Sequence, residues 1–181
     1  DTPLHNLVIV DDAPDEQYLA PEFELIQLMF RRRGTAARVA DPRELEWRDG
    51  RLWCHGSAVD MVYNRLTDFY LADPGHQALR RAYAAGVIVL TPHPRAHALY
   101  ADKRNLITLS DDELLATWGV PVTDRELLKA AVPQTRLVTA EHADELWRRR
   151  RQLFFKPVAG YGARAAYRGD KLTRRVWNEI L

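Results

Sequence analysis

A lysine and a pair of glycines near the C-terminus have residue types and a spacing suited to binding phosphate. Lys156 directly follows Leu153–Phe155, an apolar run typical of a buried strand. Gly160 and Gly162 then bracket Tyr161, and glycine lets the backbone take positive φ and approach a ligand closely. Successive N–H groups in such a loop form a concave anion site, and a lysine beside it adds a compact positive charge. The segment is therefore a candidate phosphate-binding loop, although an ordinary hairpin with a glycine turn has the same pattern.

A second group of candidate residues is polar and follows two predicted strands. Arg65 and Asp68 come after one strand, and Asp12 and Glu16 come after another. In open α/β sheets, ligands bind beyond the carboxyl ends of the strands, so both loops are expected to border one crevice. An arginine there can hold a carboxylate through two hydrogen bonds. The alternatives are a local surface pair between Arg65 and Asp68, and a solvated acidic loop that caps the following helix.

Other residues carry weaker chemical signals. Lys103 lies in a basic turn beside a predicted helix, and taken alone it is expected to be an exposed surface lysine. His93 and His97 have a spacing that can bind a metal on a helix, but Pro94 lies between them and no third ligand is evident, so no metal site is predicted. Arg148–Arg151 follow acidic residues on the same predicted helix, which favours a solvated helix face over a nucleic-acid site.

The composition limits the class of protein. The chain has 181 residues, of which 46% are hydrophobic and 28% charged, as in a soluble globular protein. A net charge of +1 gives no general attraction to nucleic acid or to anionic lipid, and no stretch reaches transmembrane length. A single cysteine, Cys54, excludes an internal disulfide framework, and with no signal peptide at the start of the chain it predicts a cytoplasmic protein.

The apolar periodicity predicts alternating strands and helices, which indicates an α/β fold with a mainly parallel sheet. The predicted strands are Leu7–Val10, Ala36–Ala40, a hairpin of Glu44–Trp47 and Arg51–Cys54 around Asp49-Gly50, Val59–Tyr63 and Val87–Leu90. The predicted helices are Tyr18–Arg33, His76–Ala85, Arg95–Leu109, Asp111–Trp118, Ala140–Arg151 and Leu172–Leu181, the last capped by Thr173 or Asp170.

The order of these features resembles the ATP-grasp ligases, most closely the permuted branch that contains eukaryotic-type glutathione synthetase and its bacterial relatives. Residues 7–25 are similar to the first βα unit of that branch's substrate domain, and residues 62–65 to its strand ending in a substrate-binding arginine. Asp102-Lys103 resembles the nucleotide-binding lysine before the ATP-binding lobe. Residues 155–162 resemble the second such lysine and its glycine-rich lid. The chain departs from glutathione synthetase in having only two glycines in this loop, with no acidic residue between Lys156 and Gly169.

The resemblance implies a Rossmann-like substrate-binding domain over residues 1–125 and a partial ATP-grasp subdomain of α+β type over residues 126–181. It implies an ATP-dependent carboxylate–amine ligase that acts through an acyl phosphate and is inactive as this segment alone. The implied cofactors are ATP and Mg²⁺, with the Mg²⁺ ligands outside the segment. The implied partners are a small carboxylate and an amine, with no nucleic acid and no membrane, and a homo-oligomer is compatible with them. The alternative is a non-catalytic module that binds a small anion or nucleotide.

The resemblance also implies a role for each candidate residue. The ATP-binding residues would be Lys103, Lys156, Gly160, Tyr161 and Gly162, and the substrate-binding residues would be Asp12, Glu16, Arg65 and Asp68.

The end of the chain predicts an incomplete second domain, because a hairpin and one helix cannot bury their own apolar faces. The chain is therefore interpreted as a fragment. Residues beyond about Val132 are expected to pack against residues 1–125, or against a neighbouring chain, so that Leu153–Phe155 are buried. A self-contained core within residues 133–181 would contradict this interpretation. In the first domain, the buried residues are expected to include Val8, Ile9, Val62, Ile88 and Val89.

Overall fold

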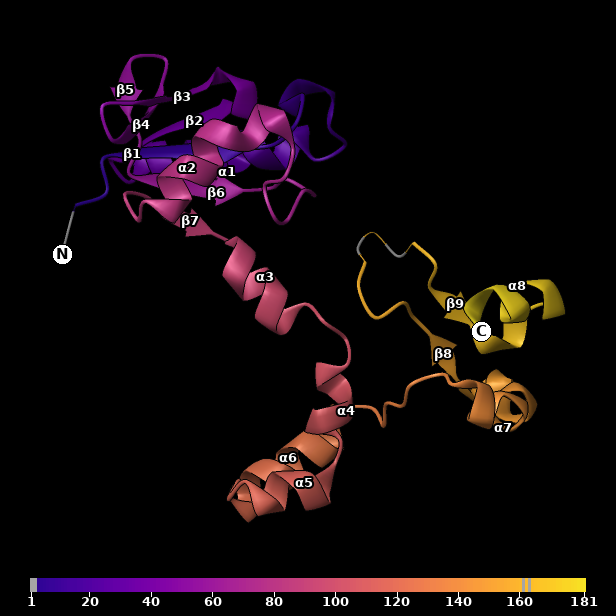
Figure 1. Ribbon diagram of the computed structural model, residues 1–181. Coiled ribbons are helices and arrows are strands. Elements are labelled where there is room, and N and C mark those ends of the chain that lie inside the picture. Colours follow the sequence, from indigo (N-terminus) through magenta and orange to yellow (C-terminus); the bar gives the residue numbers. More distant parts are fainter. Residues whose placement is uncertain (1–2, 161, 163) are drawn as a thin grey trace. The chain divides into compact units, whose positions relative to one another are not determined.

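The computed structural model describes residues 3–160, 162 and 164–181. The chain forms two compact units, Asp1–His97 and Ala98–Leu181 (Figure 1). The division into functional domains after residue 125 remains a prediction.

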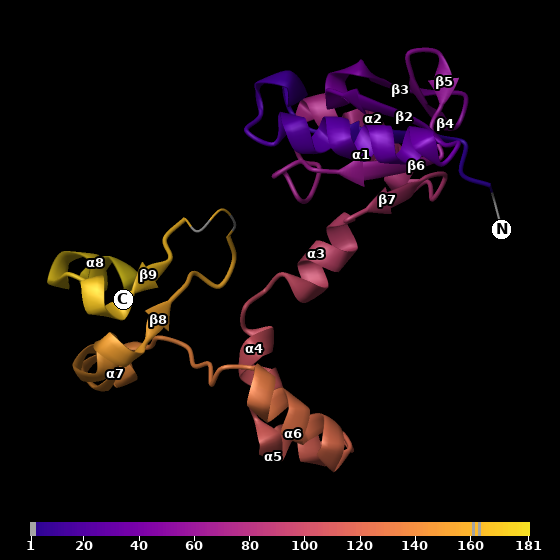
Figure 2. The ribbon, with the colours of Figure 1, turned by 180° about the vertical axis from the view of Figure 1, so that it is seen from behind.

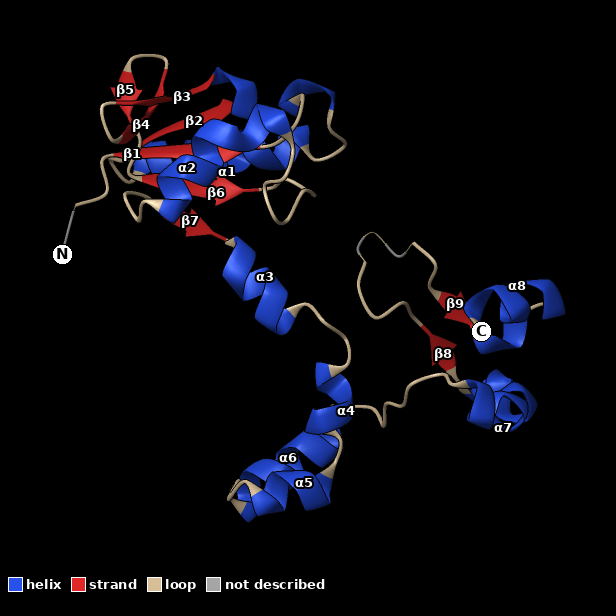
Figure 3. Cartoon of the chain, in the orientation of Figure 1, coloured by secondary structure: helices blue, strands red, loops and turns tan. Residues whose placement is uncertain are grey.

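The first unit is built on a parallel sheet of four strands in the order β2-β1-β6-β7 (Figure 3). The strands are β1 (Asn6–Val10), β2 (Ala36–Ala40), β6 (Met61–Asn64) and β7 (Val89–Thr91), and all three neighbouring pairs are parallel. Helix α1 (Ala20–Arg32) covers one face, which is in front in Figure 2, and α2 (Gln77–Ala84) covers the other, which is in front in Figure 1. The predicted mixed α/β fold with a parallel sheet is confirmed.

Alternation along β1 creates a core on each face of this sheet, because successive strand side chains point to opposite sides. Leu7 and Ile9 pack with Phe23 of α1. Val8 and Val10 pack in a larger cluster that includes Leu79 of α2. Each face of the sheet therefore has its own helix and its own apolar layer.

A small antiparallel sheet adds to the larger cluster. It consists of β3 (Leu45–Arg48), β4 (Arg51–Cys54) and β5 (Ser57–Ala58). Asp49 and Gly50 have φ values of 51° and 70°. Two successive positive φ values are characteristic of the type I′ turn. Because β3 and β4 also pair antiparallel on either side of this turn, the hairpin expected at Asp49-Gly50 is confirmed.

The edge strand β7 corrects one burial prediction. Val8, Ile9 and Val62 are buried as expected, and Ile88 is partly buried against the larger cluster. Val89, however, is 60% exposed. Because β7 pairs only with β6, the side of Val89 lacks a neighbouring strand that would help to cover it.

The second unit is mainly helical. Its elements are α4 (Asn105–Leu109), α5 (Asp112–Thr117), α6 (Val122–Ala131), α7 (Ala143–Arg149), β8 (Phe154–Phe155), β9 (Tyr167–Arg168) and α8 (Arg174–Ile180), and α3 (Pro94–Tyr100) spans the division between the units. The region expected to form one helix over residues 95–109 forms α3 and α4. Helix α6 was not predicted, and it begins directly after its N-cap Pro121. The described residues include no helix long and apolar enough to cross a membrane.

A separate apolar cluster holds the C-terminal part together. Its buried members are Leu146, Phe155, Leu172 and Trp177, and the partly buried residues packed on them also come from residues 138–180. The Phe155 and Trp177 rings meet edge-on with centroids 5.4 Å apart. The expectation that residues 1–125 or a neighbouring chain would cover Leu153–Phe155 is therefore wrong for Phe155, which α7 and α8 cover, while Phe154 stays 56% exposed. This core within residues 138–180 is the result that contradicts the interpretation of the segment as an incomplete lobe.

Candidate functional site

The second unit contains a hollow with a volume of about 380 Å³, which we call the lysine pocket. A hollow of this size falls within the range of small-molecule sites. It is lined by Lys103, Phe154, Lys156, Pro157, Gly160, Gly162, Arg164 and Ala166. The described lining therefore combines three cationic side chains, an aromatic ring and glycine backbone, and it includes no carboxylate.

Two hydrogen bonds join the turn before α4 to the glycine loop. The backbone N–H of Lys103 donates to the carbonyl of Val158 at 3.0 Å. The Lys103 ammonium donates to the carbonyl of Gly160 at 3.3 Å. Lys103 thus lies against a loop that is distant from it in sequence.

Lys156 reaches the same pocket from the end of β8. Its ammonium nitrogen lies 5.4 Å from the centroid of the Phe154 ring, a cation–π distance. Gly160 and Gly162 have φ values of 143° and 61°. Glycine adopts such values without steric cost, so the backbone conformation of the loop after β8 depends on both residues. Tyr161, which was also predicted to bind ATP, lies outside the described residues.

The chemistry of this pocket suits an anion and not a metal ion. Ammonium and guanidinium groups bind phosphate oxygens through charge-assisted hydrogen bonds. Mg²⁺ needs oxygen ligands such as carboxylates, and the described lining residues offer none from side chains. Across the described residues, no group of three or more His, Cys, Asp or Glu side chains is placed to hold a metal.

The second candidate site lies at the carboxyl edge of the parallel sheet, where the structure brings Asp12 and Asp68 to one histidine. His76 Nε2 lies 3.1 Å from Asp12 Oδ1, and its Nδ1 lies 2.9 Å from Asp68 Oδ2. The His76 side chain is 2% exposed, whereas those of Asp12 and Asp68 are 40% and 23% exposed. Both carboxylates therefore already have the His76 ring as a partner.

Further charged groups support this cluster. Arg43 donates to Asp12 Oδ1 at 3.2 Å and to Asp41 Oδ2 at 3.1 Å. Burial alone would raise the pKa of Asp41, but the backbone N–H groups of Arg43 and Ala13 and nearby positive charge outweigh it and lower that pKa. Asp68 follows the same pattern: burial opposes ionisation, while the N–H of Asp73 and the ring of His76 lower its pKa overall.

Arg65 lies at the end of β6, as predicted, but it too has protein partners. It donates to the Tyr63 hydroxyl at 3.1 Å and lies 3.4 Å from Glu22 Oε1. Its side chain remains 26% exposed. Glu16, the fourth predicted substrate residue, is exposed in the short 3₁₀ segment η1 (Pro14–Glu16).

His76 is the residue that the sequence interpretation missed. The helical periodicity predicts only that it is the first residue of a helix. Its position three residues before buried Leu79 places both on one helical face, and acidic residues lie in the loops that follow β1 and β6. A histidine on an apolar face opposite such loops was the available signal.

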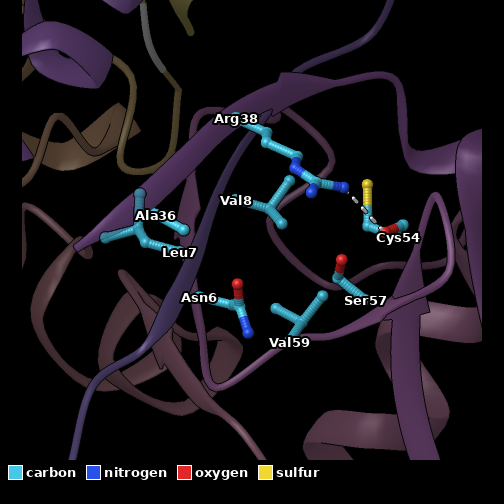
Figure 4. A pocket seen from close by; sticks show the side chains of 8 residues that line it. All are labelled: Asn6, Leu7, Val8, Ala36, Arg38, Cys54, Ser57 and Val59. Carbon is cyan, nitrogen blue, oxygen red and sulfur yellow. Dashed lines mark hydrogen bonds between the residues drawn. The ribbon is translucent and has the colours of Figure 1, made fainter. Parts of the chain in front are cut away.

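A second hollow, in the first unit, is too small to bind a substrate (Figure 4). Its volume is about 10 Å³, about that of one water-sized probe. Arg38 of β2 donates across it to the carbonyl of Cys54 at 3.3 Å. Burial raises the pKa of the Cys54 thiol, so it remains protonated and unreactive.

Comparison with known proteins adds no family assignment: no protein-family model and no curated protein matches the chain.

Proposed function

We propose that the lysine pocket binds the phosphates of ATP, and that the chain joins a substrate domain to a nucleotide-binding segment of the type found in ATP-grasp carboxylate–amine ligases. The observation that carries this proposal is the convergence of Lys103 and Lys156, which are far apart in sequence, on one hollow with Gly160 and Gly162. Among the described lining residues, charge of one sign predominates, which favours a polyanionic ligand.

Each pocket group has a role in this proposal. Lys156 binds the phosphates nearest the sugar, Lys103 holds the nucleotide against the turn before α4, and the glycine loop closes over the phosphates. In a ligase of this class, the terminal phosphate passes to a carboxylate oxygen with release of ADP. An amine then displaces phosphate from the acyl phosphate. The lysines would offset the negative charge that develops during both steps.

The proposed substrate site is at the carboxyl edge of the parallel sheet. Arg65 would orient an anionic group of the substrate, exchanging its contact with Glu22 for the incoming carboxylate. Because Asp12 and Asp68 are held by His76, we assign them to shaping this edge rather than to direct binding.

A specific observation favours the alternative, a module that binds a nucleotide or small anion without turnover. The described pocket lining lacks a carboxylate, and a ligase of this class needs Mg²⁺. Release of ADP in the presence of carboxylate and amine substrates would support the ligase. Nucleotide binding without ADP release would support the module.

Calorimetry with ATP tests the pocket itself. Lys156→Ala removes one charge-assisted interaction, worth roughly 1.5–3 kcal/mol, so ATP affinity is expected to fall about 10-fold or more. Lys171→Ala is the matched control, because Lys171 is an exposed lysine of the same unit outside the pocket lining. Equal ATP affinity of the wild type and Lys156→Ala would reject the role of Lys156.

A further inference from the structure

Three loops at the carboxyl edge of the parallel sheet meet at His76. Asp12 follows β1, Asp68 follows β6, and Arg43 belongs to the 3₁₀ segment η2 (Pro42–Glu44) that follows β2. His76 itself ends η3 (Pro74–His76), the turn that leads into α2. One buried ring therefore connects the two loops on either side of the point where the strand order reverses, between β1 and β6.

The geometry requires a particular protonation state of the ring. A neutral imidazole has one N–H donor and one acceptor nitrogen, whereas a carboxylate only accepts hydrogen bonds. His76 has a carboxylate at hydrogen-bonding distance from each nitrogen. Only the imidazolium can donate to both, and in the neutral form one ring lone pair would face a carboxylate oxygen.

We propose that His76 is a pH-sensitive clasp: as an imidazolium it holds the loop carrying Arg65 to the loop after β1, and on losing its proton it releases one of them. Arg65 lies three residues before Asp68, so the clasp is a positioning device for the candidate substrate site. The proposal stands independently of nucleotide binding, because every group involved belongs to the first unit.

The charged groups around the His76 ring determine whether its pKa is raised or lowered. Burial acts to lower the pKa of His76, but hydrogen bonds and charge from Asp12 and Asp68 outweigh it and raise that pKa. Asp41 adds a further nearby negative charge, Arg43 adds a positive charge against Asp12, and Asp73 precedes the ring in its own turn. The negative groups around the ring outnumber the positive one, and they favour the imidazolium form of His76.

The pH window follows from these directions. Stabilisation by His76 is fully present below 6.5, the ordinary histidine pKa, and is lost as the pH rises through the raised pKa of the folded protein. The contribution of Asp68 has the opposite sign, since its pKa is lowered: it is present above 3.8 and is lost on acidification. The clasp is therefore closed below pH 6.5 and opens as the pH rises through the raised pKa of His76.

The test is ring ¹⁵N NMR of the full chain across the pH range, without nucleotide. We expect both nitrogens of His76 to stay protonated above pH 6.5, the ordinary histidine pKa. We also expect the protection factor of the Asp73 amide, which donates to Asp68 Oδ2 at 2.9 Å, to fall as His76 loses its proton. A single neutral tautomer of His76 already present at pH 6.5 would overturn the proposal.

Variants separate the clasp from a packing role. Asp68→Asn removes one carboxylate and is expected to shift the titration of His76 to lower pH, whereas His5→Gln should leave it unchanged. His76→Gln should abolish the change in Asp73 protection with pH. If His76→Gln does not fold, the wild-type titration and Asp68→Asn still decide the question. An unchanged His76 titration in Asp68→Asn would contradict the clasp.

Discussion

Gly169 shows how closely two backbone segments approach each other in the second unit. A Cβ at this position would lie 1.8 Å from the carbonyl oxygen of Arg150, and the Gly169 N–H donates to the carbonyl of Leu153 at 2.9 Å. Both contacts come from the segment that connects α7 to β8. Glycine is therefore required at this position because a Cβ atom would collide with the backbone, and not because the position has an unusual φ.

Gly169→Ala is expected to destabilise the second unit by about 3 kcal/mol, because backbone atoms cannot yield as a flexible side chain can. Urea unfolding of the chain measures this change. Gly119→Ala is the control: its Cβ would meet nothing within 4 Å, and its φ of 76° should cost only about 1–2 kcal/mol. Equal losses in the two variants would show that the close approach at Gly169 is absent.

At the scale of single residues, the role of His76 could not be predicted from the sequence. Asp12 and Asp68 were expected near one another because strands of a parallel sheet end at one edge. Their engagement by a histidine depends on the path of the connection between β6 and α2, and no local pattern fixes that path. The lysine pocket was accessible to prediction through the spacing around Lys156 and the resemblance at Lys103.

At the scale of elements, strong periodicity and turn chemistry gave correct predictions. β1, β2 and the hairpin at Asp49-Gly50 lie within about a residue of their expected positions. No helix was predicted between Pro121 and Pro133, although proline is compatible with a helix start and α6 begins directly after Pro121. The exposure of Val89 depends on strand order, which the sequence of one strand does not contain.

The start of α8 provides a test of helix capping. Thr173 was one of two expected caps, and its hydroxyl accepts a hydrogen bond from the N–H of Val176 at 3.3 Å. Thr173→Ala should therefore lower the free energy of unfolding by about 1 kcal/mol, measured by urea unfolding. Thr123→Ala, at an exposed threonine within α6, should change it by less than about 0.5 kcal/mol. A larger effect at Thr123 than at Thr173 would contradict the cap assignment.

At the scale of the whole molecule, each of the two compact units has apolar clusters built from its own described residues. Local unfolding is therefore expected to follow the units. Leu79→Ala removes a fully buried side chain from the first unit and should destabilise that unit by about 2–5 kcal/mol. Trp177→Ala should do the same in the second unit, by about 3–5 kcal/mol.

Hydrogen exchange resolved by segment measures both effects in one experiment. Leu79→Ala should reduce protection in β1 and β6 and leave α7 and α8 unchanged, and Trp177→Ala should do the reverse. Loss of protection throughout the chain from either substitution would show that the units fold as one.

The central claim, that the lysine pocket binds ATP, is tested most directly by the reactivity of the four lysines. Lys103 and Lys156 line the pocket, whereas Lys129 and Lys171 lie elsewhere on the surface and act as internal controls. Acetylation of the full chain is followed at each lysine by mass spectrometry, with and without millimolar ATP. We expect ATP to slow modification of Lys103 and Lys156 and to leave the two controls unchanged. Equal reactivity of all four lysines with and without ATP would contradict the claim.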